Sequence, residues 1–159
     1  MNKFRVIPLP TEIAQAMRRD LRDEYGNTLV AETSVGGAEP CRHCLKRAVP
    51  GEKLLLFAHS PFAASGPYKE VGPIFVHSHA CRRYERSDAF PEDFKRAPVV
   101  LRGYDERQTI AMAELVEPAA VERRIEAMLQ SPEVAFIQVR SWTYGCYLCR
   151  IDRSAEAAR

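Results

Sequence analysis

The stretch VVLRGYDERQTIAMAELV, residues 99–116, decides the expected fold. Residues 99–104 and 109–116 are rich in apolar and β-branched side chains, which is typical of strands. The polar residues Asp105 and Glu106 lie between them as a turn, so the two predicted strands are expected to pair as a hairpin. An antiparallel pair is therefore the first element of the predicted architecture.

Two helices and further strands are predicted around this hairpin. One helix spans residues 118–130, because Pro118 suits a first helical position and a buried stripe follows at Val121, Ile125, Met128 and Leu129. The other spans about 11–25, with Thr11 as its N-cap and Gly26 as its stop. Additional strands are predicted at residues 53–59, 74–77, 134–139 and 144–151. This order predicts an α+β fold with a mostly antiparallel sheet, in a single domain covering residues 1–159.

Composition and charge narrow the class of protein. The chain has 159 residues, of which 46% are hydrophobic and 28% charged, as in an ordinary globular protein. A net charge of +2, with acids and bases mixed, indicates neither nucleic acid nor an anionic membrane as the partner. No apolar run suits a membrane helix or a secretory signal, so a cytoplasmic location is expected. The partner stays unidentified, and a homo-oligomer stays open.

Cysteine and histidine residues form the one group in the sequence that suits metal binding or thiol chemistry. The chain contains five cysteines, and in a reducing compartment these are expected to be free thiols or metal ligands. Cys41 and Cys44 follow Pro40 and precede a Pro-Gly turn, so both sulfurs can face one ion in a tight knuckle. The sequence predicts a zinc site at Cys41, Cys44, His77 and Cys81, with His79 as a substitute for His77.

The order of these elements is similar to a treble-clef zinc site over residues 40–86. A knuckle is followed by two strands and then by a short helix, predicted over 78–85 with Ser78 as its cap, whose first turn carries Cys81. The glycine that usually follows the second knuckle cysteine is replaced by Leu45.

Two other interpretations of Cys41 and Cys44 stay open. Free cysteine is often a small buried apolar residue, and both could simply belong to the core. Alternatively, Arg42 and His43 would lower a thiolate pKa and favour a redox protein, although a thioredoxin-type motif expects a strand before it and a helix after it. Cys146 and Cys149, in the predicted strand 144–151, are expected to be sheet core.

An enzyme is the main alternative to a binding protein. The loop between 59 and 79 is rich in proline and glycine, and it carries His59, Tyr68 and Glu70 as candidate acid–base groups. A catalytic site would gather them in one pocket with His77. Trp142 is expected either in the core or at an interface.

Several stretches together resemble a known family. They are PCRHCL (40–45), PGE (50–52) with LLL (54–56), PYKEVGPIFVH (67–77), Cys81 and Gly145-Cys146. The chain resembles the bacterial domain-of-unknown-function family 1203. The resemblance implies bacterial origin, a cytoplasmic location and a one-domain protein, but no assigned activity. The leading expectation is a non-catalytic intracellular binding domain with a structural zinc ion and otherwise no cofactor.

Overall fold

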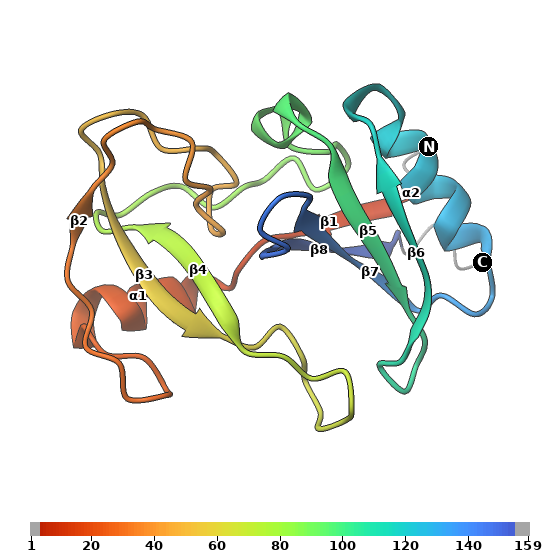
Figure 1. Ribbon diagram of the computed structural model, residues 1–159, viewed down its shortest axis with the longest axis horizontal. Coiled ribbons are helices and arrows are strands. Elements are labelled where there is room, and N and C mark those ends of the chain that lie inside the picture. Colours follow the sequence, from red (N-terminus) through yellow and green to blue (C-terminus); the bar gives the residue numbers. More distant parts are fainter. Residues whose placement is uncertain (1–3, 155–159) are drawn as a thin grey trace.

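Two antiparallel sheets form the framework of the computed structural model, which describes residues 4–154 (Figure 1). The larger sheet has the strand order β1-β8-β7-β5-β6, made of β1 (Phe4–Ile7), β5 (Val99–Tyr104), β6 (Ile110–Val116), β7 (Phe136–Ser141) and β8 (Tyr147–Arg153). The smaller sheet has the order β2-β3-β4, made of β2 (Glu32–Thr33), β3 (Lys53–His59) and β4 (Gly72–His77). The predicted α+β class with mostly antiparallel pairing is confirmed.

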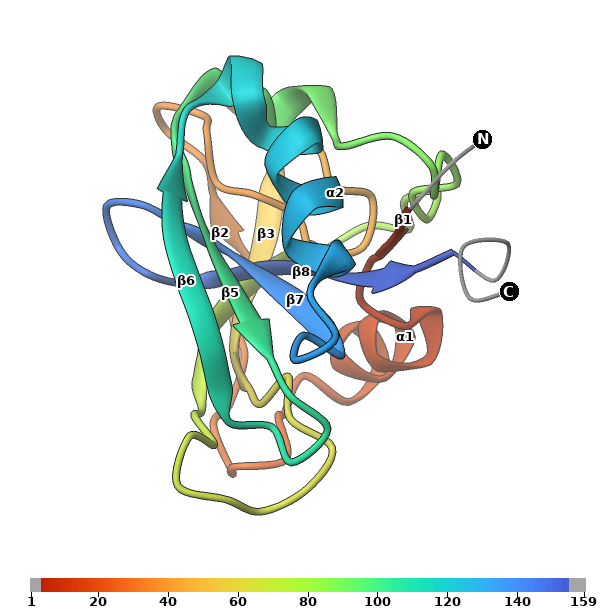
Figure 2. The ribbon, with the colours of Figure 1, turned by 90° about the vertical axis from the view of Figure 1, so that its right-hand side faces the viewer.

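Helix α2 (Val121–Gln130) covers one face of the larger sheet (Figure 2). A single 3-10 turn, η2 (Pro118–Ala120), leads into it, so the helical segment predicted at 118–130 is confirmed. The predicted stripe is buried throughout, at Val121, Ile125, Met128 and Leu129. It shares one core with strand residues such as Leu101, Ile137 and Val139. Because side chains alternate along a strand, Arg102, Gln138 and Arg140 lie on the opposite face.

Helix α1 (Thr11–Asp20) is shorter than the predicted 11–25. Leu21 adopts a left-handed conformation with φ 48°, and its N–H donates to the carbonyl of Met17, which ends the helix. The Asp23 carboxylate then accepts backbone N–H groups of Tyr25 and Asn27 and holds the chain in a turn. The predicted N-cap was also wrong, because Pro10 occupies that position and the Thr11 hydroxyl lies against His43 instead.

The predicted short helix at 78–85 is absent, and the next helical segment is the 3-10 helix η1 (Glu92–Arg96). Backbone N–H groups at both ends of this segment bond other parts of the chain. The N–H of Ser78 donates to Lys53 O on β3, and the N–H of Tyr84 donates to His43 O, at 2.9 and 3.0 Å. Long-range pairing thus outweighs the local helix signal.

The final strand pair begins later than predicted. Strands β7 and β8 start at Phe136 and Tyr147, because residues 142–146 form the turn that joins them. In that turn Gly145 has φ 71°, and the register shift opposite Val139 and Arg140 falls at Leu148, inside β8. Cys149 is core, as predicted, but Cys146 lies in the turn and is only half-buried.

Candidate metal centre

A tight knuckle holds Cys41 and Cys44. The N–H of Leu45 donates to Cys41 O and the N–H of Cys41 donates to Lys46 O, both at 2.9 Å. Leu45 has φ 55°, the conformation for which glycine is usual at this point of a knuckle. That conformation costs a non-glycine residue roughly 1–2 kcal/mol. Because the Leu45 side chain is buried in the core of the larger sheet, its packing explains why glycine is not required.

Strand β4 brings His77 to the knuckle. Cys41 forms a parallel bridge with Phe75, and the N–H of Arg42 donates to Phe75 O at 2.9 Å. The knuckle therefore lies along β4, which ends at His77. The chain then reverses direction and returns Cys81 to the same place.

The four residues Cys41, Cys44, His77 and Cys81 converge on one point. Their ligand atoms all lie within 4.8 Å of one another. Cys41 Sγ is 3.9 Å from Cys81 Sγ, and Cys44 Sγ is 3.5 Å from His77 Nδ1. Cys41, Cys44 and His77 are buried, while Cys81 is half-buried. Three sulfurs and one imidazole nitrogen at this spacing can hold a metal ion, and the knuckle has the form of a zinc-knuckle-like site.

His79 lies outside this group of four. Its ring is exposed, with its centroid 4.9 Å from that of His77, and it forms a separate group with His77 and Glu52. His77 rather than His79 is thus the histidine that faces the sulfurs.

The ligand candidates are surrounded by polar contacts that the sequence did not reveal. His77 turns its second ring nitrogen, Nε2, to Glu52 Oε2 at 3.1 Å. Cys81 Sγ lies 3.1 Å from His43 Nδ1 and accepts a hydrogen bond from Arg18 Nη2 at 3.3 Å. The His43 ring is held in turn by Thr11 Oγ1, 2.9 Å from its Nε2. No local motif marks Arg18 or Glu52, since only folding brings α1 and the turn before β3 to the cluster.

These contacts shift the pKa values of the cluster. The neighbouring thiols of Cys44 and then Cys81 hold the pKa of Cys41 well below its usual value. Hydrogen bonding toward the sulfurs of Cys41 and Cys81 raises the pKa of His77 to about 10. Burial lowers the pKa of His43, which favours a neutral ring between Thr11 and Cys81.

The candidate catalytic residues do not meet at one point. His59 and Glu70 line one cavity, but Tyr68 does not line it and its side chain is largely exposed. His59 pairs with Gly72, and His77 pairs with Leu54 at the other end of the β3–β4 hairpin. Five residues of strand separate those ends, which is roughly 17 Å.

Trp142 is 54% exposed, so it is not a core residue. It lies in the turn between β7 and β8, beside Tyr144, which is also exposed.

Comparison with known proteins places the chain in a family. A family model described as a protein of unknown function (DUF1203) matches residues 38–153, so the chain belongs to this family and the expected resemblance is confirmed. The match includes all four residues of the cluster. No curated protein and no solved structure matches the chain. Within residues 4–154, no helix has the length and apolar character needed to cross a membrane.

Proposed function

We propose that this member of the DUF1203 family is a single non-catalytic binding domain whose smaller sheet is stabilised by one structural zinc ion. Cys41, Cys44, His77 and Cys81 would hold the ion. The five free cysteines agree with a reducing compartment such as the cytoplasm, where zinc–thiolate sites are common and structural disulfides are rare.

The spacing of the ligand atoms carries this proposal. Zinc bonds of about 2.3 Å to sulfur and about 2.0–2.1 Å to nitrogen, in a tetrahedron, place two sulfurs about 3.8 Å apart and sulfur and nitrogen about 3.6 Å apart. Cys41 Sγ and Cys81 Sγ are separated by 3.9 Å, and Cys44 Sγ and His77 Nδ1 by 3.5 Å. These distances suit two edges of a zinc tetrahedron.

The contacts around the cluster agree with a structural ion. A metal-bound histidine commonly donates its other ring N–H to a carboxylate, and Glu52 stands in that position against His77 Nε2. Four protein ligands close the coordination sphere, which leaves no position for a reactive water. The ion would join the knuckle, the end of β4 and the chain at Cys81.

Redox chemistry and catalysis are less well supported. Thiol exchange requires an accessible thiolate, whereas Cys41 is fully buried at 0% exposure. An enzyme using the loop 59–79 would need its acid–base groups together, and His77 lies far from His59 along the hairpin.

Elemental analysis of tag-free protein purified without chelator tests the proposal. We expect about one zinc ion per chain. The proposal would be contradicted if the purified protein contains no metal, has five reactive thiols and melts at the same temperature with and without added zinc.

Cys44→Ser should release the ion and lower the melting temperature. Cys149→Ser is the matched control, since it alters another buried cysteine that packs in the core of the larger sheet. The control is expected to lose stability but keep its zinc. Equal metal loss in both variants would show that unfolding, rather than loss of a ligand, releases the ion.

A further inference from the structure

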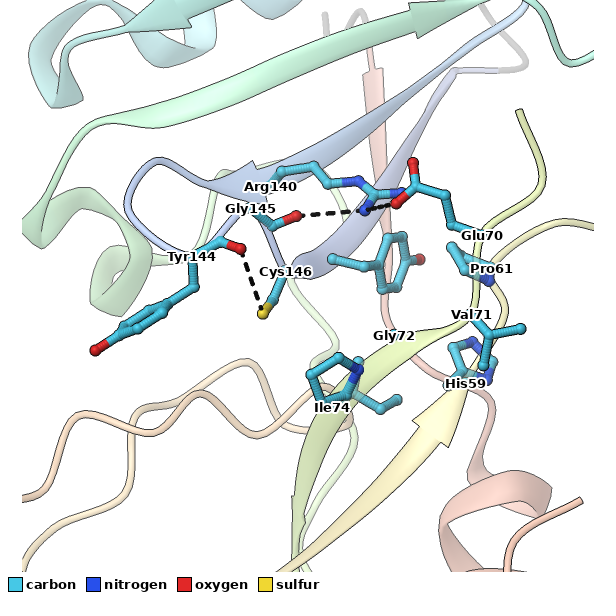
Figure 3. Close-up of a pocket in the computed structure, with 12 residues that line it drawn as sticks. His59, Pro61, Glu70, Val71, Gly72, Ile74, Arg140, Tyr144, Gly145 and Cys146 are labelled. Carbon is cyan, nitrogen blue, oxygen red and sulfur yellow. Dashed lines mark hydrogen bonds and ion pairs between the residues drawn. The ribbon is translucent and has the colours of Figure 1, made fainter. Parts of the chain in front are cut away.

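The cavity lined by His59 and Glu70 is a hollow between the two sheets, separate from the cysteine cluster. It has a volume of about 230 Å³ and is bounded by the end of β3, the start of β4 and the turn 142–146 (Figure 3). Ile74, Val71 and the ring of Tyr147 contribute apolar wall, and His59 lies on one side. Concave sites of this kind, with a few convergent polar groups, are the usual form of small-molecule pockets.

Strand register gathers arginines on the sheet face beside this hollow, and of these Arg140 lines it. Arg102, Gln138 and Arg150 lie directly opposite one another on β5, β7 and β8. Arg140 is two residues further along β7, so it lies on the same face, which is the face turned away from α2. Its side chain lines the hollow although it is only 5% exposed. A buried cation is costly unless acceptors surround it.

Within residues 4–154, Arg140 and its neighbour Gln138 keep donors without a partner. Arg140 Nη1 donates to Glu70 Oε2 at 3.1 Å and to Gly145 O at 3.3 Å, and Nη2 donates to Gln138 Oε1 at 2.6 Å. Two further buried donors, Arg140 Nε and Gln138 Nε2, have no acceptor among the described residues. An unpaired buried donor is unfavourable, which favours a ligand rich in acceptors at Arg140, the member of this pair that lines the hollow.

The carboxylate that Arg102 and Arg140 share comes from a loop. Glu70 bonds Arg102 at 2.8 Å and Arg140 at 3.1 Å, and its side chain remains 45% exposed. It belongs to residues 60–71, which have no regular secondary structure, whereas both arginines stand on strands. Figure 3 shows Glu70 meeting Arg140 at the edge of the hollow. Two arginines that stand on strands therefore share one half-exposed carboxylate from a loop.

We propose that this hollow binds a small organic acid, whose carboxylate takes the place of Glu70 against Arg140 and Arg102. The apolar body of the acid lies on Ile74 and Tyr147. The ring of His59, which lines the hollow and whose pKa burial lowers, offers a hydrogen bond to a polar substituent. The ligand adds to the binding role proposed above, but its site is independent of the zinc ligands.

Titration of the intact chain with benzoate, acetate and inorganic phosphate, at constant ionic strength, tests this site. Amide chemical shifts measured by NMR report the dissociation constants. We expect benzoate to bind more tightly than acetate or phosphate and to shift the amides of residues 70–72, 74 and 140–147.

Glu70→Gln should tighten benzoate binding. If Glu70 occupies the arginines for about nine-tenths of the time, removing its charge raises the apparent affinity about tenfold. Glu133→Gln is the matched control, because it makes the same charge change at an exposed position in the turn before β7. The control is expected to leave the affinity unchanged. Arg140→Lys keeps the charge but loses the planar fork, and we expect it to weaken binding.

Three outcomes overturn the proposal. The first is that neither the natural chain nor folded Glu70→Gln binds benzoate. The second is equal affinity for phosphate and benzoate. The third is an equal gain in benzoate affinity in Glu70→Gln and Glu133→Gln. The zinc content of each variant, measured in parallel, separates this result from the metal site. A chain that binds one zinc ion but no benzoate retains the structural proposal and loses only this one.

Discussion

The larger and the smaller sheet bury their helices to very different extents. Helix α2 places four of its ten residues in the core of the larger sheet. Helix α1, also ten residues long, fully buries only Ala14 against the smaller sheet. Where apolar area is scarce, small folds commonly rely on a metal or another cross-link.

The core beside the smaller sheet also differs in composition from the core of the larger sheet. Its buried members include Cys41 and Cys44 beside aliphatic residues of β3 and β4. The larger core is mainly aliphatic and aromatic, and its one cysteine, Cys149, lies away from the cluster. We therefore infer that packing stabilises one region and that ligation supplements packing in the other. Four predictions test this difference.

Metal removal should have the largest effect, confined to the smaller sheet. An ion present at a thousandfold excess over its dissociation constant stabilises the folded state by about 4 kcal/mol. After chelation we expect faster hydrogen exchange at the knuckle, β3 and β4, with protection retained in β5 and β7. Uniform loss of protection across both sheets would contradict two separately stabilised regions.

Leu101→Ala should weaken the larger region through packing alone. Leu101 is fully buried under α2, and a Leu→Ala cavity costs about 3 kcal/mol. Chemical denaturation would measure this loss, and zinc content should stay the same. Leu115→Ala, at a 58% exposed position in the neighbouring strand, is the control and should change the free energy of unfolding by less than about 0.5 kcal/mol. Loss of zinc from folded Leu101→Ala would mean that the two regions are coupled.

Glu52→Gln should lower zinc affinity while leaving the larger region unchanged. The Glu52 carboxylate orients His77, and removing such a partner typically costs 10–100-fold in metal affinity. Competition with a chelating dye would measure this change. Glu32→Gln, an exposed change on β2, should keep the original affinity. If both variants bind zinc as the natural chain does, Glu52 has no role in holding His77.

Leu21→Gly should give the smallest effect, a gain in stability. Leu21 is 45% exposed and adopts the left-handed conformation that ends α1. This conformation is unfavourable for leucine, whereas glycine adopts it freely. We expect the free energy of unfolding to rise by up to about 1 kcal/mol, which raises the melting temperature by roughly 2–4 °C. Leu21→Ala keeps the unfavourable conformation and should not share the gain. A fall in melting temperature for Leu21→Gly would show that the Leu21 side chain contributes packing.

Local pattern was sufficient where neighbours in sequence are also neighbours in space. The stripe of α2 and the β5–β6 hairpin depend on spacing over a few residues, and both lie close to their predicted bounds. The same applies to the knuckle, where Cys41 and Cys44 sit on one turn. The helix predicted at residues 78–85 is absent, because N–H groups of this segment bond β3 and the knuckle.

The fold class, the family and the group of three cysteines and a histidine could be predicted from the sequence. Those conclusions depend on residue types and short spacings, which the chain displays directly. Only the tertiary structure decided that His77 rather than His79 faces the sulfurs and that Glu52 and Arg18 surround the cluster. It also placed Glu70 against Arg140, residues 70 apart in sequence. Such contacts arise when sheets and loops pack, since no local pattern records which distant segments will meet.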